Sequence, residues 1–254
     1  MRAGDWWHRR VLLRDAALDL LLGSACVGCG EPGRLLCTRC RGELPATAVP
    51  TRPDPCPPGL VDCWAAGDYD AVLRALVLGH KERGLHALRV PLRDLLLTAL
   101  GPCLDRVRTG GAEGLVLVPV PSRASTVRAR GHDPTWTMTR GAAAIAARGG
   151  LPVGAARLLR LRPGVLDQAG LDTAARAANL TGSMTCPSPA LRRLAASRPR
   201  VQVVVCDDVV TTGSTLREAQ RALEAVGLVV AGAAVVAATR RRRPPAAGPA
   251  SPRG

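Results

Sequence analysis

The chain has 254 residues, of which 47% are hydrophobic, enough for a buried core in one large domain or in one domain with an appendage. Its net charge of +15 favours an anionic partner such as nucleic acid, a phosphorylated metabolite or an acidic protein. Its four tryptophans and one tyrosine are too few and too scattered for a base-stacking platform, and no run of about 20 apolar residues predicts a transmembrane helix.

The N-terminal segment, residues 1–23, is expected to form an amphipathic helix. Leu13, Ala17 and Leu20 recur at helical spacing and place an apolar stripe on one face. A secretory or lipoprotein signal is the alternative, but Arg14 and Asp19 interrupt the apolar run that such a signal needs. We therefore expect a cytoplasmic protein.

Residues 24–63 are rich in Cys, Pro and Gly and are expected to form a small module held together by a metal ion. Two C-x2-C pairs can place four thiolates around one Zn²⁺ ion; these cysteines are Cys26, Cys29, Cys37 and Cys40. Four thiolates leave no open coordination position, so the zinc would be structural. Disulfides are not expected in a cytoplasmic chain with nine cysteines. Whether Cys56 and Cys63 bind a second metal is left open.

From residue 64 to residue 239, short apolar runs alternate with helical patterns. Helices are expected at 70–79, 85–100, 136–147 and 214–226, and strands at 115–121, 153–161, 201–209 and 228–239. The segment SRASTVRARGHDP is expected to be a loop, residues 162–200 show little pattern, and residues 240–254 are expected to be a disordered basic tail. This alternation predicts an α/β fold, in which a parallel sheet is flanked by helices and ligands bind beyond the carboxyl ends of the strands.

The stretch CDDVVTTGST follows the valine-rich strand at 201–209 and carries the most specific chemistry in the chain. Small residues after Val210 can turn so that backbone N–H groups converge on a phosphate at the start of the next helix. The two carboxylates, Asp207 and Asp208, would repel a second phosphate but accept hydrogen bonds from a vicinal diol. A ligand that carries a phosphate next to a vicinal diol is a ribose 5-phosphate. The alternatives are a generic strand–turn–helix unit and the acidic pocket of a receiver-type fold.

This stretch resembles the signature of type I phosphoribosyltransferases, which bind phosphoribosyl pyrophosphate (PRPP). Other segments are similar to the ComF family within that group: LVLVPVPSRASTVRARG, the lone lysine in LGHKERG, and the N-terminal four-cysteine module. Further positions match the family pattern at Gln168, Leu171, Arg176, Asn179 and Gly182. The chain departs from that pattern at HDP (132–134), where the family has a Gly-Phe-Asn-Gln-like run, and at Met184, where it has Phe. The resemblance spans about residues 24–239.

The resemblance implies a phosphoribosyltransferase-like domain at 64–239, following the zinc module, that binds PRPP with Mg²⁺ and transfers its phosphoribosyl group to an unidentified acceptor. Asp207 and Asp208 would hold the ribose hydroxyls, and Arg176 and Gln168 would lie on a loop that closes over the site. The remaining implied contacts are the 5-phosphate loop Thr211, Thr212, Gly213, Ser214 and Thr215, the diphosphate-binding arginines Arg123, Arg128 and Arg130, and the phosphate-reaching Lys81.

A second function remains open, because ComF proteins are associated with natural competence, the uptake of DNA. The chain would then be a non-catalytic PRPP sensor or a DNA-handling module whose partner is single-stranded DNA or a protein of the uptake machinery. The charge of +15, the zinc module and the basic run Arg240–Arg243 favour this alternative. The scarcity of aromatic residues counts against direct contact with bases.

Overall fold

A computed structural model describes residues 24–109, 113–162, 182–197 and 201–239. Their centre is a six-stranded sheet in the order β1-β2-β8-β7-β3-β4. The strands are β1 (Val49–Thr51), β2 (Cys63–Asp68), β3 (Leu115–Pro119), β4 (Val153–Ala155), β7 (Gln202–Val210) and β8 (Val230–Ala238). Every neighbouring pair is parallel except β1 with β2, which is antiparallel.

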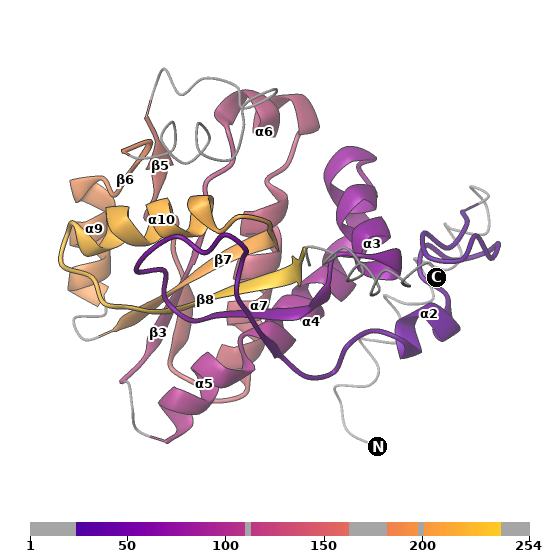
Figure 1. Cartoon of the computed structure of the whole chain (residues 1–254), viewed down its shortest axis with the longest axis horizontal. Helices are drawn as coiled ribbons and strands as arrows, with labels where there is room; N and C mark the ends of the chain where they lie inside the picture. The colour runs from indigo at the N-terminus through magenta and orange to yellow at the C-terminus, as the bar shows by residue number, and fades with distance from the viewer. Residues whose placement is uncertain (1–23, 110–112, 163–181, 198–200, 240–254) are drawn as a thin grey trace, which may run out of the picture.

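Helices cover both faces of this sheet and give the fold three layers (Figure 1). On one face lie α3 (Ala71–Glu82), α4 (Arg89–Ala99) and α7 (Pro134–Arg148), and on the other lie α9 (Ser188–Ser197) and α10 (Ser214–Glu224). Side chains of β3 alternate between the two layers, as the two-residue period of a strand requires. Leu117 packs in the core of the first face and Val116 in the core of the second, and both are almost fully buried. The continuous apolar run that predicted this strand is therefore explained by burial on both faces.

Shorter elements connect these layers. They are α2 (Thr38–Gly42), the 3-10 helix η1 (His86–Leu88), α5 (Gly101–Arg108), α6 (Ala124–Arg130) and a separate antiparallel pair of β5 (Arg160–Leu161) with β6 (Met184–Thr185). None of the helices in the described ranges is both long enough and apolar enough to cross a membrane.

The expected α/β class, a mostly parallel sheet flanked by helices, is confirmed. Strands β3, β7 and β8 and helices α3, α4, α7 and α10 lie where the patterns predict them. The expectation of a loop at SRASTVRARGHDP is wrong, because residues 124–130 form α6, which ends at Gly131 in the left-handed conformation (φ 73°). The candidate strand 153–161 is divided, since only Val153–Ala155 joins the main sheet and Arg160–Leu161 pairs with β6. Residues 1–23 and 240–254 lie outside the described ranges.

Candidate functional site

The acidic pair of β7 lies at a step in the sheet. Neighbouring β3 ends at Pro119, which is paired with Cys206, and the Val120 N–H donates to the Cys206 carbonyl (2.9 Å). β7 continues beyond this point to Val210, paired only with β8. Asp207 and Asp208 therefore lie just past the carboxyl end of β3.

This step coincides with the switch point of the sheet. The chain leaves β3 through α6 and α7 toward β4 on one side, and it leaves β7 through α10 toward β8 on the other. Because the two connections diverge, a crevice is expected between the carboxyl ends of β3 and β7, the usual place for a ligand in such a sheet.

Lys81, the single lysine of the chain, lies beside the second carboxylate. Its Nζ is 2.6 Å from Oδ2 of Asp208, and the Asp208 residue is only 8% exposed. Burial alone would lower the pKa of Lys81, but the charge and hydrogen bond of Asp208, together with the charge of Asp207, outweigh burial and raise that pKa. Helix α3 thus contributes a cation to the site from a position 127 residues away in the sequence.

Asp207 is half-buried, and its carboxylate accepts a hydrogen bond from the N–H of Asp208 (Oδ1 to N, 2.8 Å). Burial, together with the neighbouring charge of Asp208, raises the pKa of Asp207 to about 8. The site therefore disfavours negative charge at this carboxyl and would gain from a bound cation or from hydrogen-bond donors.

The turn after β7 begins α10 at a glycine in the left-handed conformation. Gly213 has a φ of 71° and is followed by the first helical hydrogen bond, from the Arg217 N–H to the Gly213 carbonyl (2.9 Å). The hydroxyl oxygens of Thr212 and Ser214 are 3.1 Å apart, and the Ser214 N–H points to Thr212 Oγ1 at 3.5 Å. Hydroxyl groups and the first-turn amides of an eleven-residue helix are thus gathered next to the acidic pair.

A proline-rich segment packs over this turn, which the sequence did not predict. A Cβ on Gly213 would lie 2.7 Å from Pro53 Cγ and 3.0 Å from Leu60 Cδ2. The segment is fixed to α10, because the side-chain amide of Gln220 donates to the Gly59 carbonyl and the Val61 N–H donates to Gln220 Oε1, both at 3.0 Å. Glycine is needed at position 213 for both its backbone angle and the lack of space.

The expected diphosphate-binding arginines are placed on or next to α6. Arg123 is the residue preceding the first turn of α6, and Arg128 is exposed in its last turn. Arg130 is already paired with Glu82 of α3, at 2.7 Å. Gln168 and Arg176 lie outside the described residues.

The four cysteines of the N-terminal module come together as expected. The Sγ atoms of Cys26, Cys29, Cys37 and Cys40 all lie within 4.8 Å of one another. The Cys37 N–H donates to Cys26 Sγ and the Cys40 N–H to Cys37 Sγ, both at 3.4 Å. Although burial opposes it, backbone donors lower the pKa of the Cys26 thiol to about 6. A donor set of four thiol sulfurs fits a structural zinc ion.

The remaining cysteines have no such arrangement. Cys63 opens β2, and burial raises the pKa of its thiol to about 12, while the thiol of Cys56 donates to the Pro57 carbonyl. In the described part of the chain, neither residue belongs to a cluster of three or more metal-ligating side chains.

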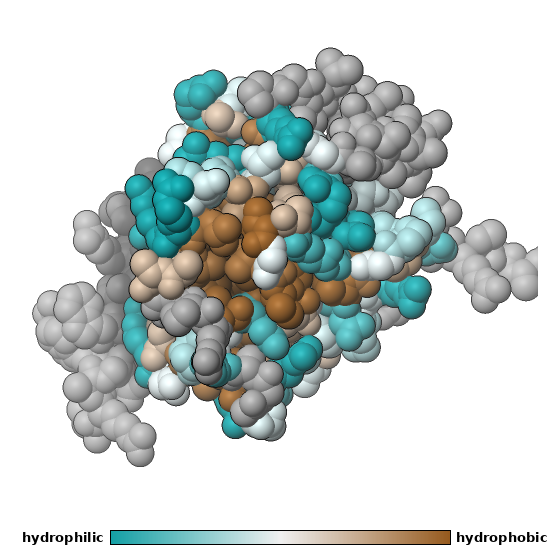
Figure 2. All heavy atoms as spheres, turned by 90° about the vertical axis from the view of Figure 1, so that its left-hand side faces the viewer, coloured by the Kyte–Doolittle hydropathy of each residue, from teal (hydrophilic) through white to brown (hydrophobic). Residues whose placement is uncertain are grey.

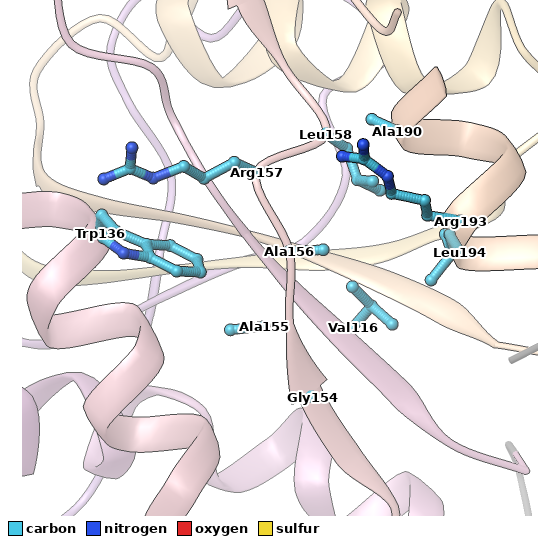
Figure 3. Close-up of a pocket in the computed structure, with 10 residues that line it drawn as sticks. All are labelled: Val116, Trp136, Gly154, Ala155, Ala156, Arg157, Leu158, Ala190, Arg193 and Leu194. Carbon is cyan, nitrogen blue, oxygen red and sulfur yellow. The ribbon is translucent and has the colours of Figure 1, made fainter. Parts of the chain in front are cut away.

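A separate pocket of about 410 Å³ opens at the β4 edge of the sheet. Trp136, Arg157 and Arg193 stand around an apolar floor that includes Val116 and Leu194 (Figure 3). The guanidinium of Arg157 lies 4.8 Å from the ring centre of Trp136. Apolar side chains also gather on the face of the molecule that includes α9, where polar side chains surround them (Figure 2). The acidic pair, Lys81 and the Thr211–Thr215 turn do not line this pocket.

Comparison with known proteins identifies one part of the chain. No curated protein matches it. Residues 146–250 match the family model described as the phosphoribosyl transferase domain. The matched stretch contains β7, the acidic pair, the Thr211–Thr215 turn and α10, whereas Lys81 and the cysteine cluster lie before it. The match supports a phosphoribosyl transferase domain at residues 146–250, and the narrower resemblance to the ComF family stays a prediction.

Proposed function

We propose that this protein binds PRPP with Mg²⁺ at the step beyond β3 and transfers the phosphoribosyl group to an acceptor. One observation carries the proposal: two adjacent carboxylates and a hydroxyl-lined helix start lie side by side at the switch point, within the stretch that matches the phosphoribosyl transferase domain. The cytoplasmic location expected from the sequence belongs to the same proposal.

The 5-phosphate would bind at the start of α10. The first-turn N–H groups and the positive end of the helix dipole favour an anion there. Thr212 and Ser214 supply hydroxyl donors that are 3.1 Å apart. The proline-rich segment around Pro53 keeps the turn in shape by packing on Gly213.

The ribose hydroxyls would donate hydrogen bonds to Asp207 and Asp208. Lys81 supplies one positive charge for two carboxylates, and the raised pKa of Asp207 supports a site that would gain from a further cation. Carboxylate oxygens next to a diphosphate are a donor set that suits Mg²⁺. When bound, Mg²⁺ would neutralise part of the diphosphate charge.

In the transfer, the bond from the ribose C1 to the diphosphate oxygen breaks and a bond from C1 to the acceptor nucleophile forms. Asp207 and Asp208 keep the ribose fixed while positive charge develops at C1. Arg123 and Arg128 are placed on or beside α6, which follows β3, so they are the candidates to hold the departing diphosphate. Arg130 is engaged by Glu82 and would instead fix α6 to α3.

The alternative is a non-catalytic module that senses PRPP or handles single-stranded DNA for uptake. The net charge of +15 favours it, since polyanions are attracted regardless of sequence. A mobility-shift titration with single-stranded DNA at low and high salt tests this alternative. Binding that weakens steeply with salt supports it, and no shift at low salt rejects it.

Thermal unfolding with a set of ligands tests the proposed transferase site. PRPP with Mg²⁺ should raise the unfolding temperature more than ribose 5-phosphate, and more than pyrophosphate with Mg²⁺, because only PRPP occupies every subsite. Release of pyrophosphate after addition of an acceptor would then establish catalysis. The proposal fails if PRPP stabilises the protein no more than pyrophosphate does at equal concentration.

A further inference from the structure

Three of the four histidines in the sequence meet at a second cluster, away from the cysteines. His80 lies in α3, His86 in η1, and His132 in the connection between α6 and α7. One ring nitrogen from each lies within 4.8 Å of the other two. The ring centres are 4.4 Å apart for His86 and His132, 5.0 Å for His80 and His132, and 6.3 Å for His80 and His86.

Within the described part of the chain, two of the three histidine rings have a buried ring nitrogen without a hydrogen-bond partner. His80 is 1% exposed, and the Nε2 atoms of both His80 and His132 are buried without a hydrogen-bond partner among the described residues. A buried polar atom without a partner destabilises the folded state, because it has lost its hydrogen bonds to water. Two such atoms in one cluster call for a ligand that both can reach.

The opposite nitrogens of the same two rings define which form each ring takes. His80 Nδ1 is 3.4 Å from the Leu85 carbonyl oxygen, and His132 Nδ1 is 3.2 Å from the Arg130 carbonyl oxygen. A carbonyl can only accept, so in the neutral ring each Nδ1 carries the proton and each Nε2 offers a lone pair. Metal-binding histidines typically have this arrangement, in which one nitrogen donates to a backbone carbonyl and the other binds the metal.

We propose that His80, His86 and His132 bind a single divalent transition-metal ion of the zinc class. Neutral imidazoles suit such ions, and Zn–N bonds of about 2.0–2.1 Å place the nitrogens of a tetrahedral site roughly 3.3 Å apart. The present nitrogen separations, within 4.8 Å, are wider than this, so binding would require the rings to turn toward a common point, and His86 is an exposed residue. Three protein ligands leave one coordination position open to water or to a ligand oxygen.

The site would join α3, η1 and the α6–α7 connection. His80 directly precedes Lys81, the partner of Asp208, and His132 lies two residues after Arg130, the partner of Glu82. A metal ion here would therefore fix α3 against the α6–α7 connection. This inference does not depend on whether the chain binds PRPP.

Metal stoichiometry tests the proposal. The full-length protein is stripped with a chelator, refilled with excess Zn²⁺, desalted and measured for zinc per chain by mass spectrometry. We expect two zinc ions in the wild type and one in His86→Ala, an exposed substitution that leaves the core intact. His132→Gln should give the same loss, while His8→Ala, at the fourth histidine of the sequence, should retain two.

Cobalt substitution separates the two sites. The four-cysteine site should give an intense thiolate-to-cobalt absorption in both the wild type and His86→Ala. The second equivalent should add only the weak bands of a nitrogen-ligated ion, and only in the wild type. The proposal is overturned if the wild type binds one ion per chain, or if His86→Ala and His132→Gln bind as many ions as the wild type.

Discussion

Lys81 on α3 and Asp208 on β7 form an ion pair 2.6 Å long across 127 positions of sequence. The pair places the one lysine of the chain next to the carboxylates that we propose to hold the ribose. It also connects the matched phosphoribosyl transferase domain to a helix that precedes it. Lys81 is therefore paired with the acidic pair, and the phosphate contact expected of it from the sequence stays a prediction.

Replacing Lys81 with methionine should destabilise the protein by about 1–3 kcal/mol, since the buried carboxylate of Asp208 loses its partner. Chemical denaturation measures this change. Lys81→Met combined with Asp208→Asn should cost less than the sum of the two single changes, because the double variant leaves no unpaired charge. Strict additivity in this cycle would show that the two side chains do not interact.

Gly213→Ala should destabilise the protein more than Gly131→Ala. Both glycines have a φ near 72°, namely 71° and 73°, so both substitutions carry the backbone penalty of about 1–2 kcal/mol. Only at position 213 would the new Cβ also meet Pro53, at 2.7 Å, whereas position 131 has open space. Urea denaturation of the two variants should differ by about 1 kcal/mol or more. Equal losses would mean that the proline-rich segment does not pack on this turn.

The stability of the protein should depend on pH through Asp207. The folded-state pKa of about 8 lies above the ordinary value of 3.8, so the folded state holds this proton more tightly than the unfolded state. The resulting stabilisation is present below about pH 4 and is lost as the pH rises to about 8.

Asp207→Asn mimics the protonated carboxyl at every pH. The unfolding temperature of the variant minus that of the wild type should therefore increase from pH 4 to pH 8 and stay constant above pH 8. A change of 1 kcal/mol in the free energy of unfolding shifts the unfolding temperature by about 2–4 °C. Thermal scans without added Mg²⁺ or ligand measure the difference, with Asp105→Asn on the exposed surface of α5 as the control. A constant difference across this pH range would contradict the raised pKa.

Cys29→Ser should remove one zinc ion per chain and lower the unfolding temperature. The four-cysteine module packs on α3, where a Cβ at Gly79 would approach Val27 at 3.6 Å, so loss of the metal should also weaken that helix. Cys186→Ser changes a cysteine outside the cluster and should keep the zinc. If Cys29→Ser retains the zinc content of the wild type, the four-thiolate site is wrong.

The β7–turn–α10 unit could be predicted from the sequence because its signals are local. Consecutive valines specify a buried strand, and the small residues after Val210 specify the turn. α6 was missed because a short, Arg-rich helix without an apolar face has no periodic signal; it has no buried residue. The partners of Lys81 and of the three histidines could not be predicted, since each depends on packing between segments far apart in the sequence.

Isothermal titration of the protein with PRPP in the presence of Mg²⁺ tests the central claim most directly. The wild type should bind one PRPP per chain. Asp207→Asn should bind at least tenfold more weakly, because a carboxylate that accepts from the ribose hydroxyls is lost, and Asp105→Asn should bind like the wild type. Absence of binding to the wild type, or equal affinity in Asp207→Asn, would contradict the assignment of this acidic pair to a ribose ligand.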